Sequence, residues 1–313
     1  MDDEIHTMPR TLLIIGATGK QGGSVIQALL DQDADFEILA ATRDASSKSA
    51  QSLLSKSANI KLVQGNLDQP EDLFICAKKV TSNSIWGVFS VQLQVPVPGG
   101  SNHEAEERQG KGLIDVALKR GVKFFLYSSV DRGGDASFES PTPIPHFISK
   151  HNIEHHLVRR ARGSGMEWTI LRPVAFLENF TPDFYGKVFT TSWKVTVKGK
   201  PLQLISTRDI GFFGAKAFLF PEEHKGKALS LAGDELTFKQ MAEIFKSETG
   251  KNVPMTFEFV SRILMSMMKD LGYMFQWFYD AGYGANISEL RKIHPGLKDF
   301  KTWLQEDSGF KEI

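Results

Sequence analysis

The first half of the chain alternates short apolar runs with segments of helical spacing. The runs lie at residues 11–16, 36–42, 59–65, 84–91 and 122–130, and a helical or polar segment follows each of them. Strands that are apolar at nearly every position are typical of a sheet buried on both faces. The alternation predicts a parallel sheet covered by helices on both sides and joined by right-handed crossovers.

A sixth run, "EWTILRP" at 167–173, extends the predicted sheet. Beyond it the rhythm changes, and shorter strands ("KVTVKG", "LQLIS", "ALSLAG") alternate with helices near 208–220, 237–249 and 257–280. We therefore predict an α/β chain with a Rossmann-like doubly wound sheet over 1–173. A smaller α/β lobe is predicted over 174–313, and the two lobes are allowed to share sheet and helices.

Charge and cysteine content exclude several classes of function. The 313 residues contain 37 Lys and Arg against 37 Asp and Glu, so no overall field favours nucleic acid or an anionic membrane. One cysteine, Cys76, excludes an internal disulfide and a cysteine zinc cluster, and we expect it to be a small core residue. The N-terminus is acidic without an apolar run. The expectation is a cytoplasmic protein, or a cytoplasmic and nuclear one, without membrane or direct nucleic-acid contact.

A glycine loop opens the first strand-to-helix turn. "IIGATGKQGGSVI" places Gly16, Gly19 and Gly22 three residues apart, directly between the first predicted strand and helix. In a dinucleotide fingerprint these glycines allow the tight turn, the approach of the pyrophosphate and close helix packing. The helix N-terminus offers N–H groups to phosphate. The alternative is a glycine-rich turn without a ligand; no Lys-Thr or Lys-Ser pair follows, so a nucleoside-triphosphate loop is not supported.

The end of the second strand bears on the choice of coenzyme. An acid there is typical of NAD binding, whereas an arginine favours the 2′-phosphate of NADP. This chain has Arg43, with Lys20 in the glycine loop as a second candidate cation. Asp44 follows directly and complicates the interpretation, and a surface salt bridge is the alternative role of Arg43. We predict NADP(H).

Several motifs taken together resemble a known family. "GATGKQGGSVI", "AATRD", "LVQGNLD", "VFSVQ", "EERQGKGLIDVALKRGVKFFLYSSV", "LRPVAFLENF" and "STRDIGFFGAKA" are similar to the NmrA-like family of atypical short-chain dehydrogenases/reductases. The resemblance covers nearly the whole chain and is closest to the HSCARG-type redox-sensor branch. It implies an NADP(H) site formed by Gly16, Ala17, Thr18, Gly19, Lys20, Gln21, Gly22, Arg43, Asn66, Leu67, Asp68, Gln92, Leu93, Lys150, Phe176, Leu177, Glu178 and Asn179. Asn66 stands where relatives often have aspartate.

The resemblance also identifies Lys150 as the active-site lysine. Catalytic relatives carry a tyrosine four residues earlier, on the same helix face, but here that position is His146. His146 is therefore a candidate proton donor, a structural or ligand-contacting residue, or part of a solvated helix face. Ser128 or Ser129 could orient a substrate carbonyl, or could be ordinary strand-end hydroxyls.

The remaining histidines of the same helix do not follow a zinc motif. His151 and His155 are four residues apart, but Asn152 occupies the glutamate position of HExxH, so we predict no metal and a solvated face. A further segment, 256–284, is rich in methionine and aromatic residues. Its helical spacing predicts a core stripe formed by Phe259, Ile263, Met267 and Leu271. The methionines and Trp277 beyond this stripe would form a pocket wall, a lid or a partner surface. Asp209 is predicted to be an N-cap.

Two functions follow as hypotheses. The first is an NADP(H)-occupancy sensor that changes shape and protein partner, either as a monomer or as a homodimer. The second is an NADPH-dependent reductase of an apolar carbonyl or conjugated small molecule, with Lys150 holding the coenzyme and His146 or a water supplying the proton.

Overall fold

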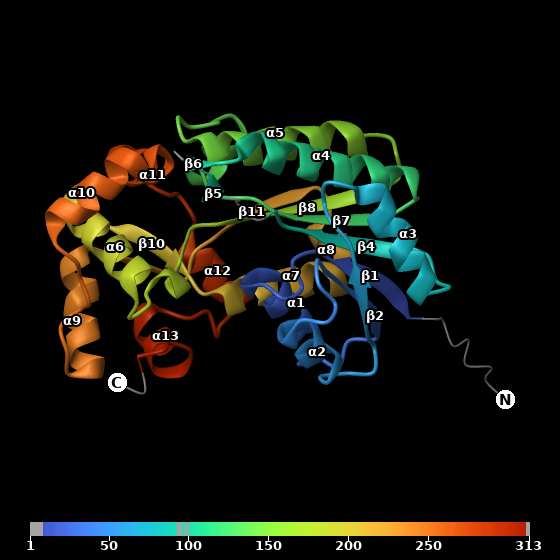
Figure 1. Ribbon diagram of the computed structural model, residues 1–313, viewed down its shortest axis with the longest axis horizontal. Helices are drawn as coiled ribbons and strands as arrows, with labels where there is room; N and C mark the ends of the chain where they lie inside the picture. Colours follow the sequence, from blue (N-terminus) through green and yellow to red (C-terminus); the bar gives the residue numbers. More distant parts are fainter. Residues whose placement is uncertain (1–8, 93–95, 98–99, 311–313) are drawn as a thin grey trace.

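A computed structural model of the chain describes residues 9–92, 96–97 and 100–310. Within these residues seven strands form one parallel sheet, in the order β11-β8-β7-β4-β1-β2-β3. Its strands are β1 (Arg10–Ile14), β2 (Phe36–Thr42), β3 (Ile60–Gln64), β4 (Ile85–Ser90), β7 (Phe124–Ser128), β8 (Glu167–Pro173) and β11 (Lys227–Leu231). The predicted α/β doubly wound sheet with a smaller lobe is thus confirmed (Figure 1).

Helices cover both faces of this sheet. One face carries α1 (Lys20–Leu30) and α7 (Thr207–Leu219), and the other carries α3 (Pro70–Val80), α4 (His103–Lys119) and α5 (Pro145–Ala161). The short helices α2 (Lys48–Leu54) and α8 (Pro221–His224) follow β2 and α7. Because the central strands are buried on both sides, they carry apolar residues at successive positions, as at Leu12, Leu13 and Ile14 of β1.

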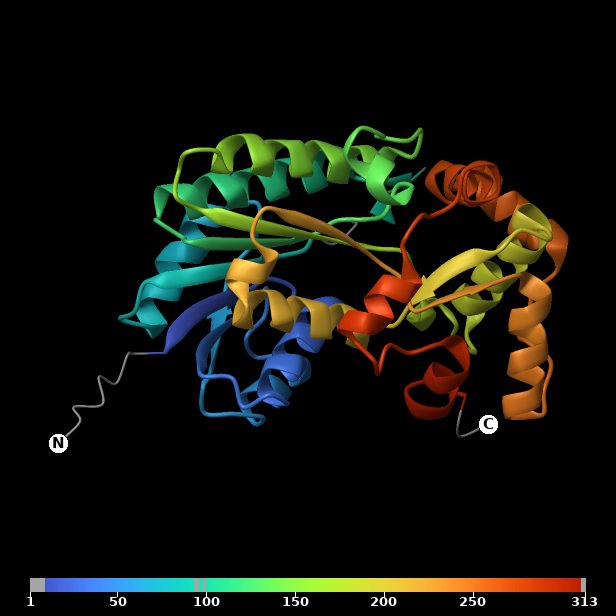
Figure 2. The ribbon, with the colours of Figure 1, turned by 180° about the vertical axis from the view of Figure 1, so that it is seen from behind.

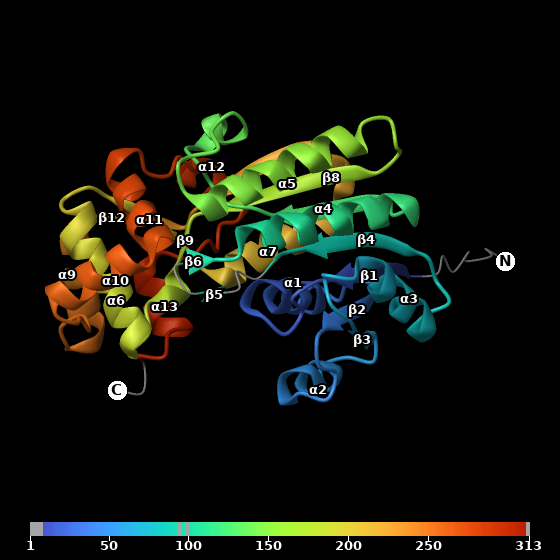
Figure 3. The same cartoon turned by 45° about the horizontal axis from the view of Figure 1, so that its top comes forward.

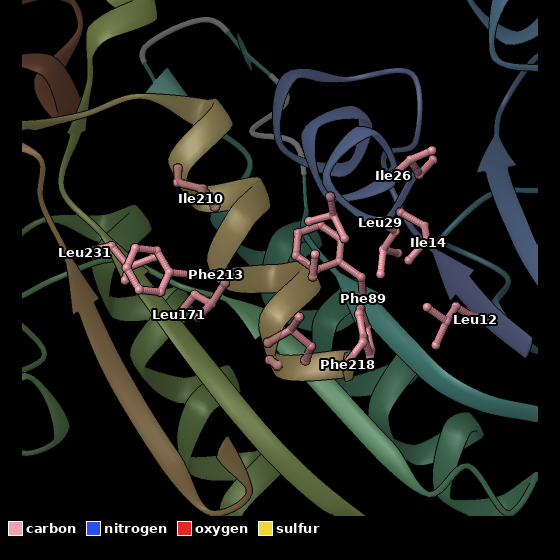
Figure 4. Close-up of a cluster of buried hydrophobic side chains, with 14 of the residues drawn as sticks. Leu12, Ile14, Ile26, Leu29, Phe89, Leu171, Ile210, Phe213, Phe218 and Leu231 are labelled. Carbon is pink, nitrogen blue, oxygen red and sulfur yellow. The ribbon is translucent and has the colours of Figure 1, made fainter. Parts of the chain in front are cut away.

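The core beneath α1 and α7 shows how these two helices pack against the sheet. Leu12 and Ile14 of β1 and Leu171 of β8 point toward Ile26, Leu29, Phe213 and Phe218 from the two helices (Figure 4). All of these side chains are almost fully removed from solvent. Burying a leucine or phenylalanine side chain contributes roughly 1.5–3 kcal/mol, so this layer fixes α1, and with it the glycine loop, against the strand ends.

The smaller lobe is built around a second, mixed sheet. It contains β9 (Ala175–Phe176), β10 (Leu202–Ile205) and β12 (Asp234–Leu236), with β10 parallel to β9 and antiparallel to β12. Helices α6 (Phe184–Ser192), α9 (Phe238–Thr249), α10 (Glu258–Met267), α11 (Lys269–Asp280), α12 (Ile287–Ile293) and α13 (Phe300–Glu306) surround it (Figure 2). An aromatic core that includes Trp193, Phe275 and Phe300 holds these elements together.

The two lobes are not separate segments of the chain. β8 passes through Val174 directly into β9, and β11, which lies beyond residue 173, pairs in parallel with β8 in the large sheet. The short pieces β5 (Pro96–Val97) and β6 (Gly100–Ser101), and the 3₁₀ turns Gly134–Phe138 and Leu177–Asn179, lie at the carboxyl ends of the strands. Among the described residues, no helix combines the length and apolar character needed to cross a membrane.

Three local predictions for the smaller lobe are wrong. "KVTVKG" is not a strand; Trp193–Val197 form a π-helical turn that continues α6, because Trp193 and Val197 are buried in the aromatic core. The predicted helix over 257–280 is broken at Met268, whose ψ of 83° is not helical. Asp209 does not cap α7; the Ser206 hydroxyl accepts the capping N–H, while Asp209 accepts hydrogen bonds from His294 and the Lys298 N–H.

The predicted core stripe on α10 is also wrong. Phe259, Ile263 and Met267 are 61%, 52% and 66% exposed, and Leu271 is only partly buried. The helix is amphipathic, but the buried face of α10 is the opposite one, which includes Ser261 against Ser192 of α6. Periodicity identifies two faces of a helix; which of them has a neighbour depends on tertiary packing.

Candidate nucleotide site at the carboxyl edge of the sheet

The glycine loop lies where the fingerprint requires it, between β1 and α1. Gly16 has a φ of +65°, a conformation that side chains disfavour. A Cβ on Gly22 would lie 2.4 Å from the Gly16 carbonyl oxygen, so only glycine lets α1 start this close to the turn. Ala17 between them is buried, whereas Thr18 is exposed. The loop is therefore shaped by backbone requirements at both ends.

The first turn of α1 is open to an anion. Its N-cap, Gly19, supplies no side-chain hydrogen bond, and no acidic residue occupies the first turn. Helix N-termini leave backbone N–H groups without partners and carry a partial positive charge. α4, α6, α9 and α13 have side-chain caps, whereas α3, α5, α10 and α11 also lack one, so the feature particular to α1 is that it directly follows the glycine loop. The uncapped α1 terminus fits a phosphate group at this position.

Polar side chains continue the site along the ends of β4 and β7. The Ser128 hydroxyl donates to Gln21 Oε1 at 2.5 Å, which ties the glycine loop to β7. Gln92 donates through Nε2 to the Ser90 hydroxyl at 2.9 Å, and its buried Oε1 has no hydrogen-bond partner within the described protein. Ser129 is contacted by Arg132 instead. Gln92 thus offers an unused acceptor at the strand edge; Leu93 lies outside the described residues.

Arg43 and Lys20 are placed differently. The Arg43 side chain is exposed at the end of β2, and Asp44 does not pair with it because its Oδ1 accepts from the Ser46 N–H and hydroxyl. These hydrogen bonds lower the pKa of Asp44. Lys20 does not join Arg43; its ammonium donates to the Glu178 carbonyl at 3.0 Å. The structure thus leaves Arg43 available to a ligand and uses Lys20 to span the two lobes.

The loop after β3 is held against α4. Asp68 Oδ1 accepts from Arg108 at 3.1 Å and from Gln109 at 2.9 Å, and these hydrogen bonds lower the pKa of Asp68. Asn66 caps the Asp68 N–H, and Leu67 is half-buried. Asp68 therefore fixes the loop, so any ligand contact from its side chain would have to compete with two hydrogen bonds.

The segment Phe176–Asn179 reaches the same edge from the smaller lobe. Leu177 is buried in the aromatic core, while Phe176 is half-buried and Asn179 is exposed. Glu178 Oε1 accepts from the Thr207 N–H at 2.9 Å and so covers the start of α7. Its second oxygen, Oε2, is buried without a hydrogen-bond partner in the described part of the chain.

His146 and Lys150 lie on the face of α5 that packs against α4. His146 is 8% exposed, and burial, followed by the charge of Lys150, lowers its pKa to about 3. The Lys150 ammonium lies 3.0 Å from Glu106 Oε1 and 5.9 Å from the centre of the Tyr127 ring. His146 is therefore a neutral, buried imidazole at neutral pH, which excludes the solvated-face alternative and disfavours protonated histidine as a proton donor.

Three residues of this cluster were not predicted from the sequence. Glu106 is 2% exposed, and its Oε2 accepts from the Ser149 hydroxyl at 2.8 Å. His103 Nε2 lies 3.0 Å from Asp270 Oδ2, which comes from α11 of the smaller lobe. The His103 ring lies 6.4 Å from the His146 ring. The three-residue spacing of His103 and Glu106 would have indicated a shared helix face, but nothing in the sequence indicated its neighbours.

The solvated face predicted for the other histidines of α5 is wrong. His151 and His155 are partly buried, and their Nε2 atoms contact one carbonyl oxygen, that of Phe138, at 3.0 and 2.8 Å. His156 contacts Asp115 of α4 at 2.9 Å. Among the residues that the structure describes, no group of His, Cys, Asp and Glu has a metal-binding arrangement. These histidines anchor α5 to its surroundings.

Fold and site together define a doubly wound α/β protein with a dinucleotide-type glycine loop. A family model for the NmrA-like family matches residues 8–304, and the chain belongs to this family.

Relatives span both the regulator and the reductase classes. An NmrA-like family domain-containing protein of Dictyostelium discoideum is 26% identical over 96% of this chain and 98% of its own. The negative transcriptional regulator NmrA in complex with NADP has a TM-score of 0.66, with 17% identity over 96% of both chains. The Citrobacter sp. triphenylmethane reductase complexed with NADP(H) has a TM-score of 0.68, with 20% identity over 95% of this chain and 99% of that one. These two structures share the fold with this chain.

Proposed function

We propose that this protein binds NADP(H) and acts as a redox sensor whose conformation and partner binding depend on the nucleotide, as in the HSCARG-type branch. The observation that carries the proposal is the pairing of a retained Lys150 with a buried His146 whose pKa is lowered to about 3. The lysine is suited to hold a ribose, while the imidazole is unsuited to deliver a proton. Binding without efficient chemistry is the expected property of a sensor.

The other residues at the carboxyl edge of the sheet would each contact a different part of the coenzyme. The uncapped first turn of α1 would bind the diphosphate, and Arg43 would bind the 2′-phosphate. The loop at Asn66–Asp68 would border the adenine, and Gln92 with Phe176–Asn179 would border the nicotinamide, which supplies or accepts a hydride when it is bound. Support for NADP over NAD comes from Asp44, whose carboxylate is held by Ser46 and leaves Arg43 unpaired.

Calorimetry tests the coenzyme assignment. NADPH, NADP⁺ and NADH are titrated into the wild type, Arg43→Ala and Arg120→Ala; Arg120 is a matched control because it pairs with Glu71 at the far end of α4. We expect Arg43→Ala to lose about tenfold or more in NADPH affinity, since a charge-assisted phosphate contact contributes roughly 1.5–3 kcal/mol. An unchanged affinity together with equally tight NADH binding would refute the choice of NADP.

Light scattering and protease sensitivity test the sensor output. NADPH and NADP⁺ should produce different oligomeric states or different cleavage patterns, and neither should be consumed. Exposed apolar residues of α10, such as Phe259 and Met267, are candidates for the surface that a regulatory protein or a second copy contacts. Identical patterns with both nucleotides and with none would refute the sensor.

A second candidate is an NADPH-dependent reductase of a carbonyl or conjugated small molecule. The observation that favours it is the His103–Asp270 contact of 3.0 Å, next to the His146 ring, because a carboxylate that orients an imidazole is typical of acid–base sites. In this case NADPH fluorescence should decay with an aromatic ketone or enone, and Lys150→Ala should abolish the decay. Slower turnover of His103→Gln would identify the proton donor.

A further inference from the structure

Two carboxylates belong to this cluster, Glu106 beside Lys150 and Asp270 beside His103, and neither has a role in the proposed sensor. Glu106 Oε1 is 3.0 Å from the Lys150 ammonium, and Glu106 Oε2 is fixed by the Ser149 hydroxyl. Asp270 contacts His103 at 3.0 Å, with side-chain exposures of 14% and 23%. Charges so far removed from water interact over longer distances than surface charges do.

The arrangement follows from the packing of two helices. His103 and Glu106 are three residues apart on α4, and His146 and Lys150 are four residues apart on α5, so each pair shares one face of its helix. α4 and α5 lie side by side over the sheet, with their N-terminal ends toward the smaller lobe (Figure 3). The faces meet there, histidine near histidine and Glu106 against Lys150, and Asp270 completes the cluster from α11.

The charge of this cluster is balanced or negative. His146 is neutral at pH 7 because its pKa is about 3. Glu106 offsets the charge of Lys150, and Asp270 adds a second carboxylate at His103. A lysine without such neighbours would make the same position positive.

We infer that Glu106 sets the preference of this site between oxidised and reduced nicotinamide. The inference rests on the proposed function, in which Lys150 holds the nicotinamide ribose. Oxidised nicotinamide carries a positive ring charge and the reduced ring does not, so a charge near the ring changes the affinity for the oxidised form relative to the reduced form. Glu106 cancels the repulsion that the Lys150 ammonium would exert on that ring. Glu106 is thus a specificity-determining residue, and a sensor needs this discrimination.

A double-mutant cycle, measured by calorimetry at pH 8, tests the inference. Affinities for NADP⁺ and NADPH are measured for the wild type, Glu106→Gln, Lys150→Met and the double variant. Glu106→Gln should weaken NADP⁺ relative to NADPH by about tenfold, as a buried charge at several ångströms implies. Lys150→Met should shift the ratio in the opposite direction. The double variant should return toward the wild-type ratio.

Two controls separate charge from structure. Glu107→Gln changes the adjacent carboxylate, which contacts Lys111 and Asn152 and not Lys150, and should leave the ratio unchanged. Glu106→Asp keeps the charge and should stay near the wild-type ratio. The inference is wrong if Glu106→Gln keeps the wild-type ratio of NADP⁺ affinity to NADPH affinity. It is also wrong if Glu106→Asp shifts this ratio as much as Glu106→Gln does. Should Glu106→Gln not fold, an unshifted ratio in Lys150→Met overturns it. A wild type that binds neither nucleotide would instead refute the proposed function.

Discussion

Helix α5 carries two buried ion clusters, one turn apart, that differ in how completely their polar atoms are paired. In the first, Glu154 is fully buried between Arg132 and Arg172, at 2.9 and 2.7 Å. Arg132 also donates to the carbonyl oxygens of Val130, Ser137 and Ser140. The second cluster is Lys150 with Glu106, together with the histidines beside them.

The second cluster leaves several buried atoms without hydrogen bonds within the described protein. These are Glu106 Oε1, which lies at ion-pair distance from Lys150 but not in hydrogen-bond geometry, and the Tyr127 hydroxyl, His103 Nδ1 and His146 Nδ1. Burial and the charge of Glu106 raise the pKa of Tyr127 well above its usual value. Buried polar atoms are normally paired, so the difference separates a structural cluster from one with capacity for a ligand.

The largest effect is expected at the structural cluster. Glu154→Gln leaves two buried guanidinium groups without a counter-charge, and breaking such a cluster costs about 3–5 kcal/mol. Urea denaturation followed by circular dichroism measures the free energy of unfolding, with Glu107→Gln as the control on the neighbouring helix. A loss below about 1 kcal/mol would show that the triad does not hold α5 in place.

His146 gives an intermediate, pH-dependent effect. Its pKa is about 3 in the folded protein against 6.5 as the ordinary value, so the unfolded chain takes up the proton first as the pH falls. Stability is therefore lost from pH 6.5 downward, by about 2 kcal/mol at pH 5 from this group alone. His146→Gln should be less sensitive than the wild type across this window. His151, His156 and His224 also have lowered pKa values, so only the difference between the two proteins is informative. Parallel pH profiles would contradict the prediction.

The smallest effect on stability is expected when the Lys150 cluster is neutralised as a pair. The double variant Glu106→Gln, Lys150→Met removes both charges together, and such replacements are often close to neutral, within about 1 kcal/mol. Thermal unfolding and NADPH titration on the same sample separate the two properties: near-normal stability with weakened binding. A collapse in stability like that of Glu154→Gln would erase the distinction between the clusters.

The sheet and the glycine loop were predictable because their signals are local. The central strands are apolar on both faces, and the Gly16 and Gly22 requirements arise within one turn. The neighbours in the Lys150 cluster were not predictable in the same way, since Glu106, the partner of Lys150, lies on another helix, and Asp270, the partner of His103, lies in another lobe. The exposed Phe259 shows the converse limit, because an amphipathic helix does not reveal which of its faces is covered.

The sequence by itself determined the alternation of strands and helices in the first half of the chain, the conformation of the first βα turn and the family of the chain, because these depend on neighbouring residues. Only the tertiary structure decided that His146 is neutral and that Glu106 accompanies Lys150. Burial and charge are properties of residues brought together from distant parts of the chain. The chemistry of the site therefore depends on packing that local sequence patterns do not encode.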